Sequence, residues 1–381
     1  MARDIFEPEH DDFRASVRGF LEREALALRD QWEADGQLDR AFWKKAAAQG
    51  FVGFEAPEEL GGLGLDDYRF NAILLEETCA LGLLPDHFML QNDVLGPYLF
   101  ELASAEQQSR WLPGFTGGDL IAAIAMSEPG AGSDLRGITT AARRDGDHYV
   151  LNGSKTFISS GTHADLIVVA ARTSAEARAS SAFSLLVVEA GMAGFERGRK
   201  LEKVGRHSQD TAELFFTDVR VPVANLLGNE GDGLRSLMRN LARERLAVSV
   251  AAVAGARYAL DLTLQYVKDR KAFGTPIGRF QVNQHALAQM TTELQIAQHY
   301  VDRCIAAEAV HALDHVDAAG LKAWTTEAQW KIVDRCLQLH GGYGYMDEYM
   351  ISRVWRDARV QRIYGGSSEI MWEIVGRSLG V

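Results

Sequence analysis

Residues 234–248 place a carboxylate and a guanidinium on the apolar face of a predicted helix. The large apolar residues of this segment recur at the three- and four-residue spacing of a packed helix: Leu234, Leu237, Met238, Leu241 and Val248. Glu244 and Arg245 fall on or beside that stripe. Arg239 and Arg243 fall on the opposite face. Charges that face a core are costly unless they are paired or used. The pattern therefore allows two interpretations, a structural Glu244–Arg245 pair or a catalytic carboxylate.

Residues 125–134, AMSEPGAGSD, form a second segment with chemical potential, because they combine small side chains with hydroxyls. Gly130 and Gly132 begin a GxGxxG-like pattern, but Leu135 stands at the third glycine position and no βαβ unit surrounds it. A Rossmann nucleotide site is therefore disfavoured. The composition instead favours a loop whose backbone comes close to a flat or phosphorylated ligand.

Four further segments place aromatic, basic or glycine residues at predicted strands and helix ends: KTFIS (155–159), DRKAFG (269–274), QLHGGYGYMDEY (338–349) and RDARVQRIYGGSSEI (356–370). In KTFIS, Phe157 can offer a ring face and Ser159 a hydroxyl, although an ordinary barrel strand explains the same residues. The two bases of DRKAFG could clamp phosphates, or they could offset the dipole of the helix that ends there.

Composition limits the class of protein. The chain has 381 residues, of which 47% are hydrophobic, and a formal net charge of -12. This acidity argues against nucleic acid as the main partner. No apolar run approaches the roughly 18 residues needed to span a bilayer, and the charged N-terminus has no apolar signal region, so we expect a cytoplasmic protein without a membrane span.

Metal binding is not expected. The three cysteines are odd in number, lack a CxxC pattern and lie in apolar helical contexts: Cys79, Cys304 and Cys336. They are predicted to be buried free thiols. His311 and His315 have a ligand-like spacing, but no third ligand stands nearby.

Hydrophobic periodicity predicts an α+β multidomain fold with a helical domain at 1–120, an antiparallel β-barrel or sandwich at 121–228 and a helical bundle at 229–381. The short β-type runs of the middle part leave no room for crossover helices. Asn152-Gly153 is predicted to form a hairpin turn. The last part is predicted to hold four long helices, at about 234–268, 280–312, 316–340 and 347–363. A short helix should follow Gly365-Gly366, capped by Ser367 or Ser368.

Taken together, these segments resemble the acyl-CoA dehydrogenase family in wording, order and spacing: AMSEPGAGSD, LNGSKTFIS, DRKAFG, QLHGGYGYMDEY and RDARVQRIYGGSSEI. PEELGGLG and AEQQSRWLPGFTGGD upstream are also similar, so the resemblance covers essentially the whole chain. It implies an N-terminal helical domain, a middle β-barrel and a C-terminal four-helix bundle. It also implies FAD as the cofactor, an acyl-CoA substrate oxidised to the trans-2-enoyl thioester, an electron-transfer flavoprotein as acceptor, and a homotetramer built as a dimer of dimers.

The resemblance also implies roles for matching positions. The implied cofactor contacts are Met126, Ser127, Ser133, Phe157, Ser159, Arg270, Phe273, Gln281, Gln338, Gly342, Ser367 and Glu369. Arg270 and Phe273 match residues that reach the flavin of a neighbouring subunit. The implied substrate contacts are Ser133, Arg245, Tyr364 and Gly365. The family usually has Trp where this chain has Phe157, which keeps the aromatic face but lacks the indole N–H.

The position of the catalytic base departs from the commonest family pattern. Most members carry a glutamate in I-Y-E-G-[TS], whereas this chain has glycine at Gly365. A branch that includes long-chain and isovaleryl-CoA dehydrogenases places the base in an E-R-L context on the first helix of the last domain, and Glu244 matches it. Glycine keeps the backbone N–H that can bind a developing enolate oxygen. Loss of hydration would raise the pKa of Glu244 toward a useful range, and a closely paired Arg245 would oppose that shift.

Two alternatives remain at this level. A flavoenzyme of the same fold could act on carrier-protein-bound acyl groups or use oxygen as an oxidase or monooxygenase. A non-catalytic acyl-thioester binder is a minor alternative, for which Gly365 is the only support. The acyl chain length, the thioester handle and the physiological electron acceptor cannot be inferred from the sequence.

Overall fold

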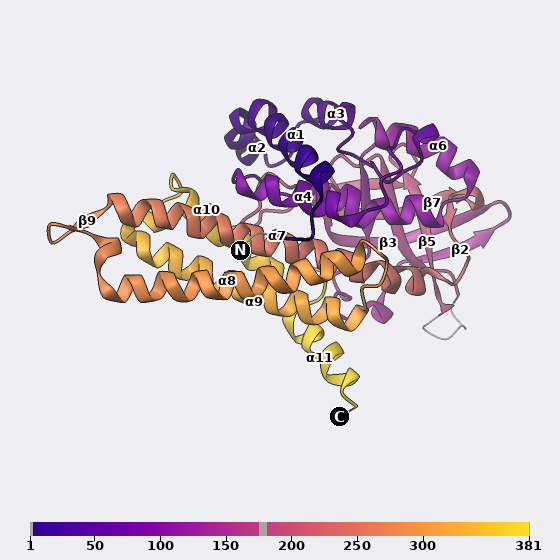
Figure 1. The fold of residues 1–381 in the computed structure, drawn as a ribbon. Helices are drawn as coiled ribbons and strands as arrows, with labels where there is room; N and C mark the ends of the chain where they lie inside the picture. Colours follow the sequence, from indigo (N-terminus) through magenta and orange to yellow (C-terminus); the bar gives the residue numbers. More distant parts are fainter. Residues whose placement is uncertain (1–2, 175–180, 381) are drawn as a thin grey trace.

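The computed structural model describes residues 3–174 and 181–380, which fold into a helical N-terminal part, a central sheet and a C-terminal helical part (Figure 1). The N-terminal elements are α1 (Pro8–Glu24), η1 (Leu26–Leu28), α2 (Arg29–Asp35), α3 (Arg40–Ala48), η2 (Glu58–Leu60), α4 (Tyr68–Ala80), α5 (Asp86–Phe88), the π-helices η3 (Met89–Leu95) and η4 (Tyr98–Leu102), and α6 (Ala105–Thr116). Helix α6 begins with a capping box between Ser104 and Gln107.

The central part is one eight-stranded sheet in the order β6-β7-β3-β2-β4-β5-β8, with β1 paired to β4. Its strands are β1 (Ala122–Ala125), β2 (Ala141–Asp145), β3 (His148–Ser159), β4 (Leu166–Arg172), β5 (Phe183–Glu189), β6 (Phe195–Lys200), β7 (Thr211–Pro222) and β8 (Leu226–Leu227); η5 (Leu135–Gly137) and η7 (Val223–Asn225) lie between them. Most pairs are antiparallel, as predicted, but β4 pairs in parallel with β1 and β2. Strands β5 and β7 touch without being neighbours in the sheet, so the sheet curves around its own apolar core.

The hairpin turn predicted at Asn152-Gly153 is wrong. Both residues lie inside β3, where a register shift against β7 separates Leu151 from Gly153. Gly153 has a φ of 148, and a Cβ there would fall 2.5 Å from the Thr140 hydroxyl oxygen. The sequence pattern therefore marks a bulge that bends a long strand, because glycine suits a bulge as well as a turn. The chain turns instead between β2 and β3, at residues 146–147.

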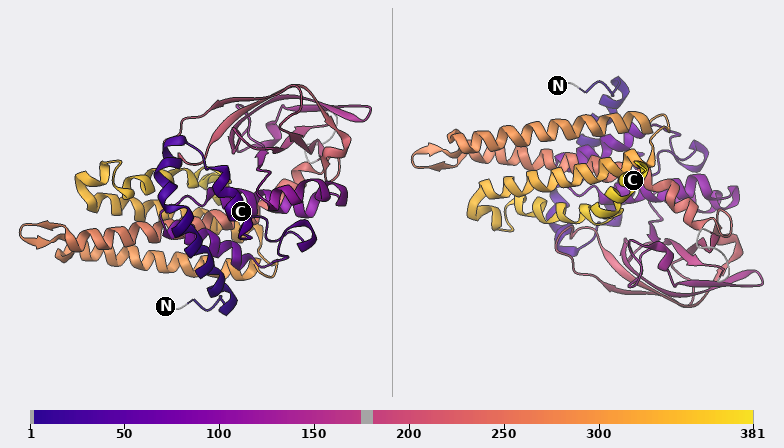
Figure 2. Two further views of the ribbon diagram at one scale, coloured as in Figure 1. Left: turned by 90° about the horizontal axis from the view of Figure 1, so that it is seen from above. Right: turned by 90° about the horizontal axis from the view of Figure 1, so that it is seen from below.

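The C-terminal part is a bundle around α7, as predicted. Its elements are α7 (Gly233–Asp269), the small strands β9 (Lys271–Ala272) and β10 (Thr275–Pro276), η8 (Ile277–Arg279), α8 (Gln281–Glu308), α9 (His315–His340), η9 (Gly341–Tyr345), α10 (Met350–Ala358), η10 (Arg359–Arg362) and α11 (Ser368–Ser378). Ser367 caps α11. Figures 1 and 2 show the sheet at one end of the molecule and the β9–β10 hairpin at the other.

Helix α7 connects the three parts. It contacts α4 and η3 of the N-terminal part, β5 of the sheet, and α8, α9 and α10. Among the described helices it alone is long and apolar enough to cross a membrane, but 67% of its apolar window is buried inside the fold. Its side chains therefore pack against protein, and residues on different faces of α7 meet different domains.

Candidate active site

Glu244 lies inside the protein on α7. Only 7% of the residue is exposed, and the hydroxyl of the fully buried Tyr98 from η4 donates a hydrogen bond to its Oε1 atom over 3.4 Å. Its Oε2 atom forms no hydrogen bond with the residues that the structure describes. Burial raises the pKa of Glu244 from 4.5 to about 7. The carboxylate is therefore poised to accept a proton near neutral pH.

Arg245 does not neutralise Glu244 through an ion pair. It is 5% exposed, and its Nε atom has no hydrogen-bond partner within residues 3–174 and 181–380. Its charge lowers the pKa of Glu244, but the larger effect of burial raises it. The first of the two interpretations of the pattern, a structural Glu244–Arg245 pair, is therefore not what the structure shows.

The expectation for the opposite face of α7 was half right. Arg239 is exposed there and pairs with Glu101. Arg243 instead points into the N-terminal part, where it forms an ion pair with Glu55 and lies over the Tyr68 ring, 5.2 Å from its centroid. The difference arises because α4 covers a face of α7 that a two-sided helical pattern assigns to solvent.

The Gly365-Gly366 turn faces the same stretch of α7. Both glycines have a positive φ, 63 and 97, and a Cβ at Gly365 would lie 4.0 Å from Cγ2 of Val248, one turn after Glu244. Lys322 on α9 fixes the turn, because its fully buried ammonium group donates a 2.6 Å hydrogen bond to the Gly366 carbonyl. Position 365 therefore packs against α7 one turn after Glu244.

The loop at 126–133 lies against β3. Lys155 donates hydrogen bonds to the Met126 carbonyl and to Oε1 of Glu128, both over 2.9 Å. The Thr156 amide donates to the Ser127 carbonyl over 3.0 Å. Met126 and Ser127 therefore lie beside the end of β3 that carries the predicted cofactor contacts at 157 and 159.

This region has an open face that suits a flat ligand. The Phe157 side chain is 70% exposed and its backbone has a φ of 60. A Cβ added at Gly130 or Gly132 would meet nothing within 4 Å, and Ser133 is exposed. Met126 packs on the same apolar cluster as Tyr98, so the open face and Glu244 border one region.

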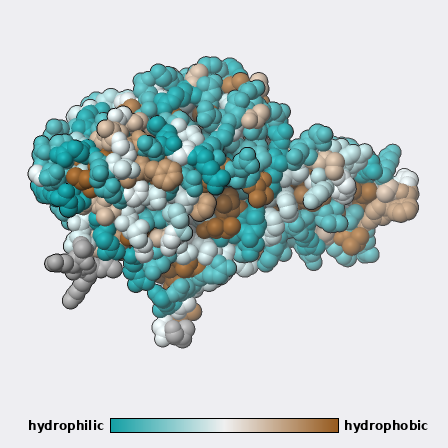
Figure 3. Space-filling view, turned by 180° about the vertical axis from the view of Figure 1, so that it is seen from behind, coloured by the Kyte–Doolittle hydropathy of each residue, from teal (hydrophilic) through white to brown (hydrophobic). Residues whose placement is uncertain are grey.

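Five further predicted cofactor residues lie at the far end of the bundle, whereas Ser367 and Glu369 lie at the start of α11 (Figure 1). Arg270, Gln338 and Gly342 line one shallow pocket there. Phe273 is 97% exposed at the tip of the β9–β10 hairpin, and Figure 3 shows apolar surface at this end of the molecule. Gln281 is exposed nearby, at the start of α8. Within one chain these residues and the 126–159 region do not meet (Figure 1).

Metal ligands do not gather in the described ranges: they contain no cluster of three or more His, Cys, Asp or Glu side chains that could hold an ion. His311 instead pairs with Asp66 at 3.1 Å. The three cysteines are buried and free, as predicted.

Comparison with known proteins gives the family. Three family models cover nearly all of the chain: Acyl-CoA dehydrogenase, N-terminal domain, at residues 7–119; middle domain, at 123–219; and C-terminal domain, at 231–380. The chain belongs to the acyl-CoA dehydrogenase family. It is 44% identical to the mitochondrial long-chain specific acyl-CoA dehydrogenase of Sus scrofa over 378 residues, which are 99% of this chain and 88% of that protein.

Solved structures agree. An acyl-CoA dehydrogenase from Geobacillus kaustophilus is 45% identical with a TM-score of 0.97, and each chain is covered completely. A glutaryl-CoA dehydrogenase from Mycobacterium smegmatis in complex with FADH2 is 25% identical with a TM-score of 0.91, over 98% of this chain and 95% of that one. A chain from a structure of the electron transferring flavoprotein of Acidaminococcus fermentans is 30% identical with a TM-score of 0.92, over 100% and 99%.

This acyl-CoA dehydrogenase has room for the family's flavin. The exposed Phe157 ring and the glycines at 130 and 132 leave a flat face without side chains in the way. The hydroxyls of Ser127, Ser133 and Ser159 are donors of the kind that a flavin's ring edge and phosphates require.

Three side chains of the site were missed by the sequence analysis: Tyr98, Lys155 and Lys322. The two lysines have side chains buried completely, although lysine is mostly exposed in proteins. Lys155 stands within the KTFIS motif between Ser154 and Thr156, and its place in that motif was the only available signal. Tyr98 and Lys322 carried none, since their partners lie 146 and 44 residues away.

We predict that Tyr98→Phe moves the acid limb of the pH–rate profile to higher pH. The base must be deprotonated to act, and the Tyr98 hydrogen bond lowers the pKa of Glu244. Losing a hydrogen bond worth about 1 kcal/mol should shift that limb by about 0.7 pH unit. The measurement is kcat/KM between pH 6 and pH 9. Tyr149→Phe, which removes a hydroxyl bound to Glu230 outside the site, is the matched control; equal profiles for both variants would contradict the prediction.

We also predict that Lys322→Met lowers kcat roughly tenfold. The Gly366 carbonyl would lose the donor that holds the turn, so the Gly365 N–H would no longer be held in its orientation. KM should change less, and Lys322→Arg should recover part of the loss. Steady-state kinetics and a melting curve separate this from general unfolding. A variant with wild-type kcat would show that the turn holds itself.

Proposed function

We propose that the chain is an FAD-dependent dehydrogenase of long-chain acyl-CoA thioesters, with Glu244 as the base that removes the α-proton. One observation carries the assignment of the base: the glycine turn at 365 packs against α7 one turn after the buried carboxylate of Glu244, and the turn itself has no carboxylate. Oxygen-using chemistry and carrier-bound substrates are not favoured, because the relatives named above are acyl-CoA dehydrogenases.

Several residues of the chain have separate roles in the proposed reaction. Glu244 takes the α-proton at its free Oε2 while Tyr98 holds Oε1. The Gly365 N–H donates to the thioester carbonyl oxygen, which gains negative charge as the proton leaves. The apolar residues of α7 around Glu244 exclude water and thereby keep the carboxylate basic. Bound FAD would accept the β-hydride, with Phe157 and Ser159 at its edge.

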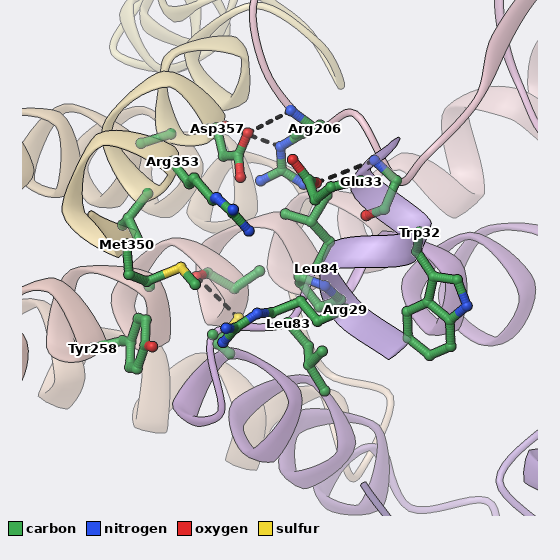
Figure 4. A pocket seen from close by; sticks show the side chains of 18 of the residues that line it. Arg29, Trp32, Glu33, Leu83, Leu84, Arg206, Tyr258, Met350, Arg353 and Asp357 are labelled. Atoms are coloured by element: carbon green, nitrogen blue, oxygen red, sulfur yellow. Dashed lines mark hydrogen bonds between the residues drawn. The ribbon is translucent and has the colours of Figure 1, made fainter. Parts of the chain in front are cut away.

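We expect a long acyl chain to lie along α7 beyond Glu244. Glu244, Val248, Ala251 and Gly255 follow each other on one face of the helix. Ala251 and Gly255 line a cavity between α2, α4, α7, α9 and α10, which we call the distal cavity; its apolar wall includes Cys79, Leu83 and Met350 (Figure 4). Its position supports a chain that runs from Glu244 along α7. The long-chain specificity in the name of the Sus scrofa relative agrees.

The assembly is proposed to be a homotetramer built as a dimer of dimers, and the electron acceptor an electron-transfer flavoprotein. The β9–β10 hairpin, which carries the exposed Phe273, and strand β3, which carries Phe157, lie in separate parts of the molecule (Figure 1). A second copy that brings its hairpin to this chain's open face would complete the site and cover apolar surface.

Product analysis tests the proposed reaction. Incubation of the flavin-loaded enzyme with hexadecanoyl-CoA and an artificial electron acceptor should give a thioester lighter by two hydrogens, which mass spectrometry resolves. The same incubation under air without acceptor should give little product. Efficient turnover that depends on oxygen, or a product that gains oxygen, would contradict a dehydrogenase.

A further inference from the structure

Two polar groups of the distal cavity, on Gln329 and Tyr258, have no partner among the described residues. Gln329 on α9 is 4% exposed, and its Oε1 atom accepts no hydrogen bond from the described residues. Arg29 at the start of α2 is not free, because its Nε atom lies 3.5 Å from Oδ1 of Asp30. The Tyr258 hydroxyl on α7 makes no hydrogen bond with any described residue, and burial raises the pKa of this group.

These groups converge. Figure 4 shows Arg29 extending into the cavity from α2 toward the side on which Tyr258 lies, and the Arg29 charge acts on the Tyr258 hydroxyl. Gln329 packs against Gly255, where an added Cβ would lie 3.0 Å from its Nε2 atom. Gly255 and Tyr258 are one turn apart on α7 and share a face. The Gln329 amide and the Tyr258 hydroxyl therefore lie on neighbouring parts of the cavity wall.

The remaining charges of the cavity wall are already paired. Arg206 forms an ion pair with Asp86 and binds Asp357. Arg353 pairs with Asp30 at 2.5 Å. Glu33 accepts a hydrogen bond from the Ser208 amide over 3.2 Å. Because carboxylates as well as arginines line the cavity, an anionic group would meet repulsion there, whereas a neutral hydroxyl would not.

We infer that the distal cavity binds a hydroxyl group carried near the far end of a long acyl chain. A hydroxyl can donate to Gln329 Oε1 and accept from the Tyr258 hydroxyl, so it satisfies both unpaired groups at once. The inference rests on the proposed function and narrows its substrate class to hydroxylated long-chain acyl thioesters.

The length of α7 gives the position of the hydroxyl. Gly255 and Tyr258 lie eleven and fourteen residues after Glu244, or about 16 and 21 Å along the helix. An extended chain advances roughly 1.3 Å for each carbon–carbon bond of about 1.5 Å. The oxygen should therefore stand roughly 13 to 16 bonds beyond the α-carbon, which is the terminal position of a hexadecanoyl chain.

The experiment compares two substrates of equal length on the flavin-loaded enzyme. In 16-hydroxyhexadecanoyl-CoA a hydroxyl replaces the terminal methyl of heptadecanoyl-CoA. Wild-type enzyme should have a kcat/KM about tenfold or more higher for the hydroxylated substrate, since a methyl leaves the buried polar groups unpaired. This preference should fall toward one in Tyr258→Phe and in Gln329→Leu. Tyr300→Phe, which removes a hydroxyl outside the cavity, should keep it.

The measured substrate preference either supports or overturns the inference. A wild-type enzyme that uses heptadecanoyl-CoA as well as its hydroxylated counterpart overturns the inference, as does a preference that survives both cavity variants. If Gln329→Leu does not fold, Tyr258→Phe carries the test, because it removes a single oxygen atom. Octanoyl-CoA is too short to reach the cavity, so it tests the proposed function separately from the hydroxyl preference. Flavin reduction by octanoyl-CoA shows a working dehydrogenase even where the hydroxyl preference is absent. If no acyl-CoA reduces the flavin, both proposals are wrong.

Discussion

Glu244→Gln should fold, bind flavin and lose the reductive half-reaction. Flavin reduction by hexadecanoyl-CoA is expected to slow by about 10²- to 10⁴-fold, the contribution of a general base. Stopped-flow absorbance at pH 8 measures the rate directly. Gly365, at the turn beside this stretch of α7, supplies no carboxylate that could replace Glu244.

Stability provides the control for this variant. Burial raises the pKa of Glu244 from 4.5 to about 7, so the folded state holds this proton more tightly than the unfolded state does. The contribution of Glu244 to stability therefore falls as pH rises through that window. The neutral glutamine escapes this cost, and the melting temperature at pH 8 should not decrease. Glu101→Gln, at an exposed carboxylate paired with Arg239, should keep wild-type reduction. A Glu244→Gln enzyme with normal flavin content and normal reduction would remove Glu244 as the base.

Lys155→Met should destabilise the middle domain and release flavin. The Lys155 ammonium is completely buried and pairs with Glu128, whose side chain is 4% exposed. Hydrogen bonds from Thr139 and Thr140 and from Lys155 outweigh burial and bring the pKa of Glu128 down to about 2, so it stays charged at neutral pH. Removing Lys155 leaves that charge without its cation, at a cost of about 3 kcal/mol or more. It also frees the Met126 carbonyl that holds the cofactor loop against β3.

Denaturant unfolding and the flavin-to-protein absorbance ratio measure both effects. Lys45→Met, at an exposed lysine paired with Glu24, is the matched control and should change stability by less than about 0.5 kcal/mol. The double variant Lys155→Met/Glu128→Leu should be more stable than Lys155→Met alone, because it leaves no buried charge unpaired. If Lys155→Met unfolds at the wild-type denaturant concentration with full flavin content, the pair is not the anchor of the loop.

Periodicity was enough to predict the main features of the fold. The four bundle helices, the cap at Ser367 and most of the α7 stripe follow from local spacing and lie as expected, but Met238 of that stripe is 50% exposed. The sequence also indicated Glu244 as a candidate functional residue, because a carboxylate on an apolar helix face is a local signal.

The features that could not be predicted from the sequence depend on contacts between distant segments. Asn152-Gly153 fits a turn and a bulge equally well, and the pairing of β3 with β7 decides between them. Arg243 occupies a polar face by sequence, yet that face is covered by α4. Lys322 has the appearance of a surface lysine until the fold brings the Gly366 carbonyl to it.

The most direct test of the account is an anaerobic absorbance titration of the purified yellow protein with acyl-CoAs from short to long, hydroxylated chains included. The account predicts that the flavin bleaches, most completely with long chains. A yellow protein that no acyl-CoA bleaches would contradict the dehydrogenase, and a colourless protein that takes up no FAD would contradict the site itself.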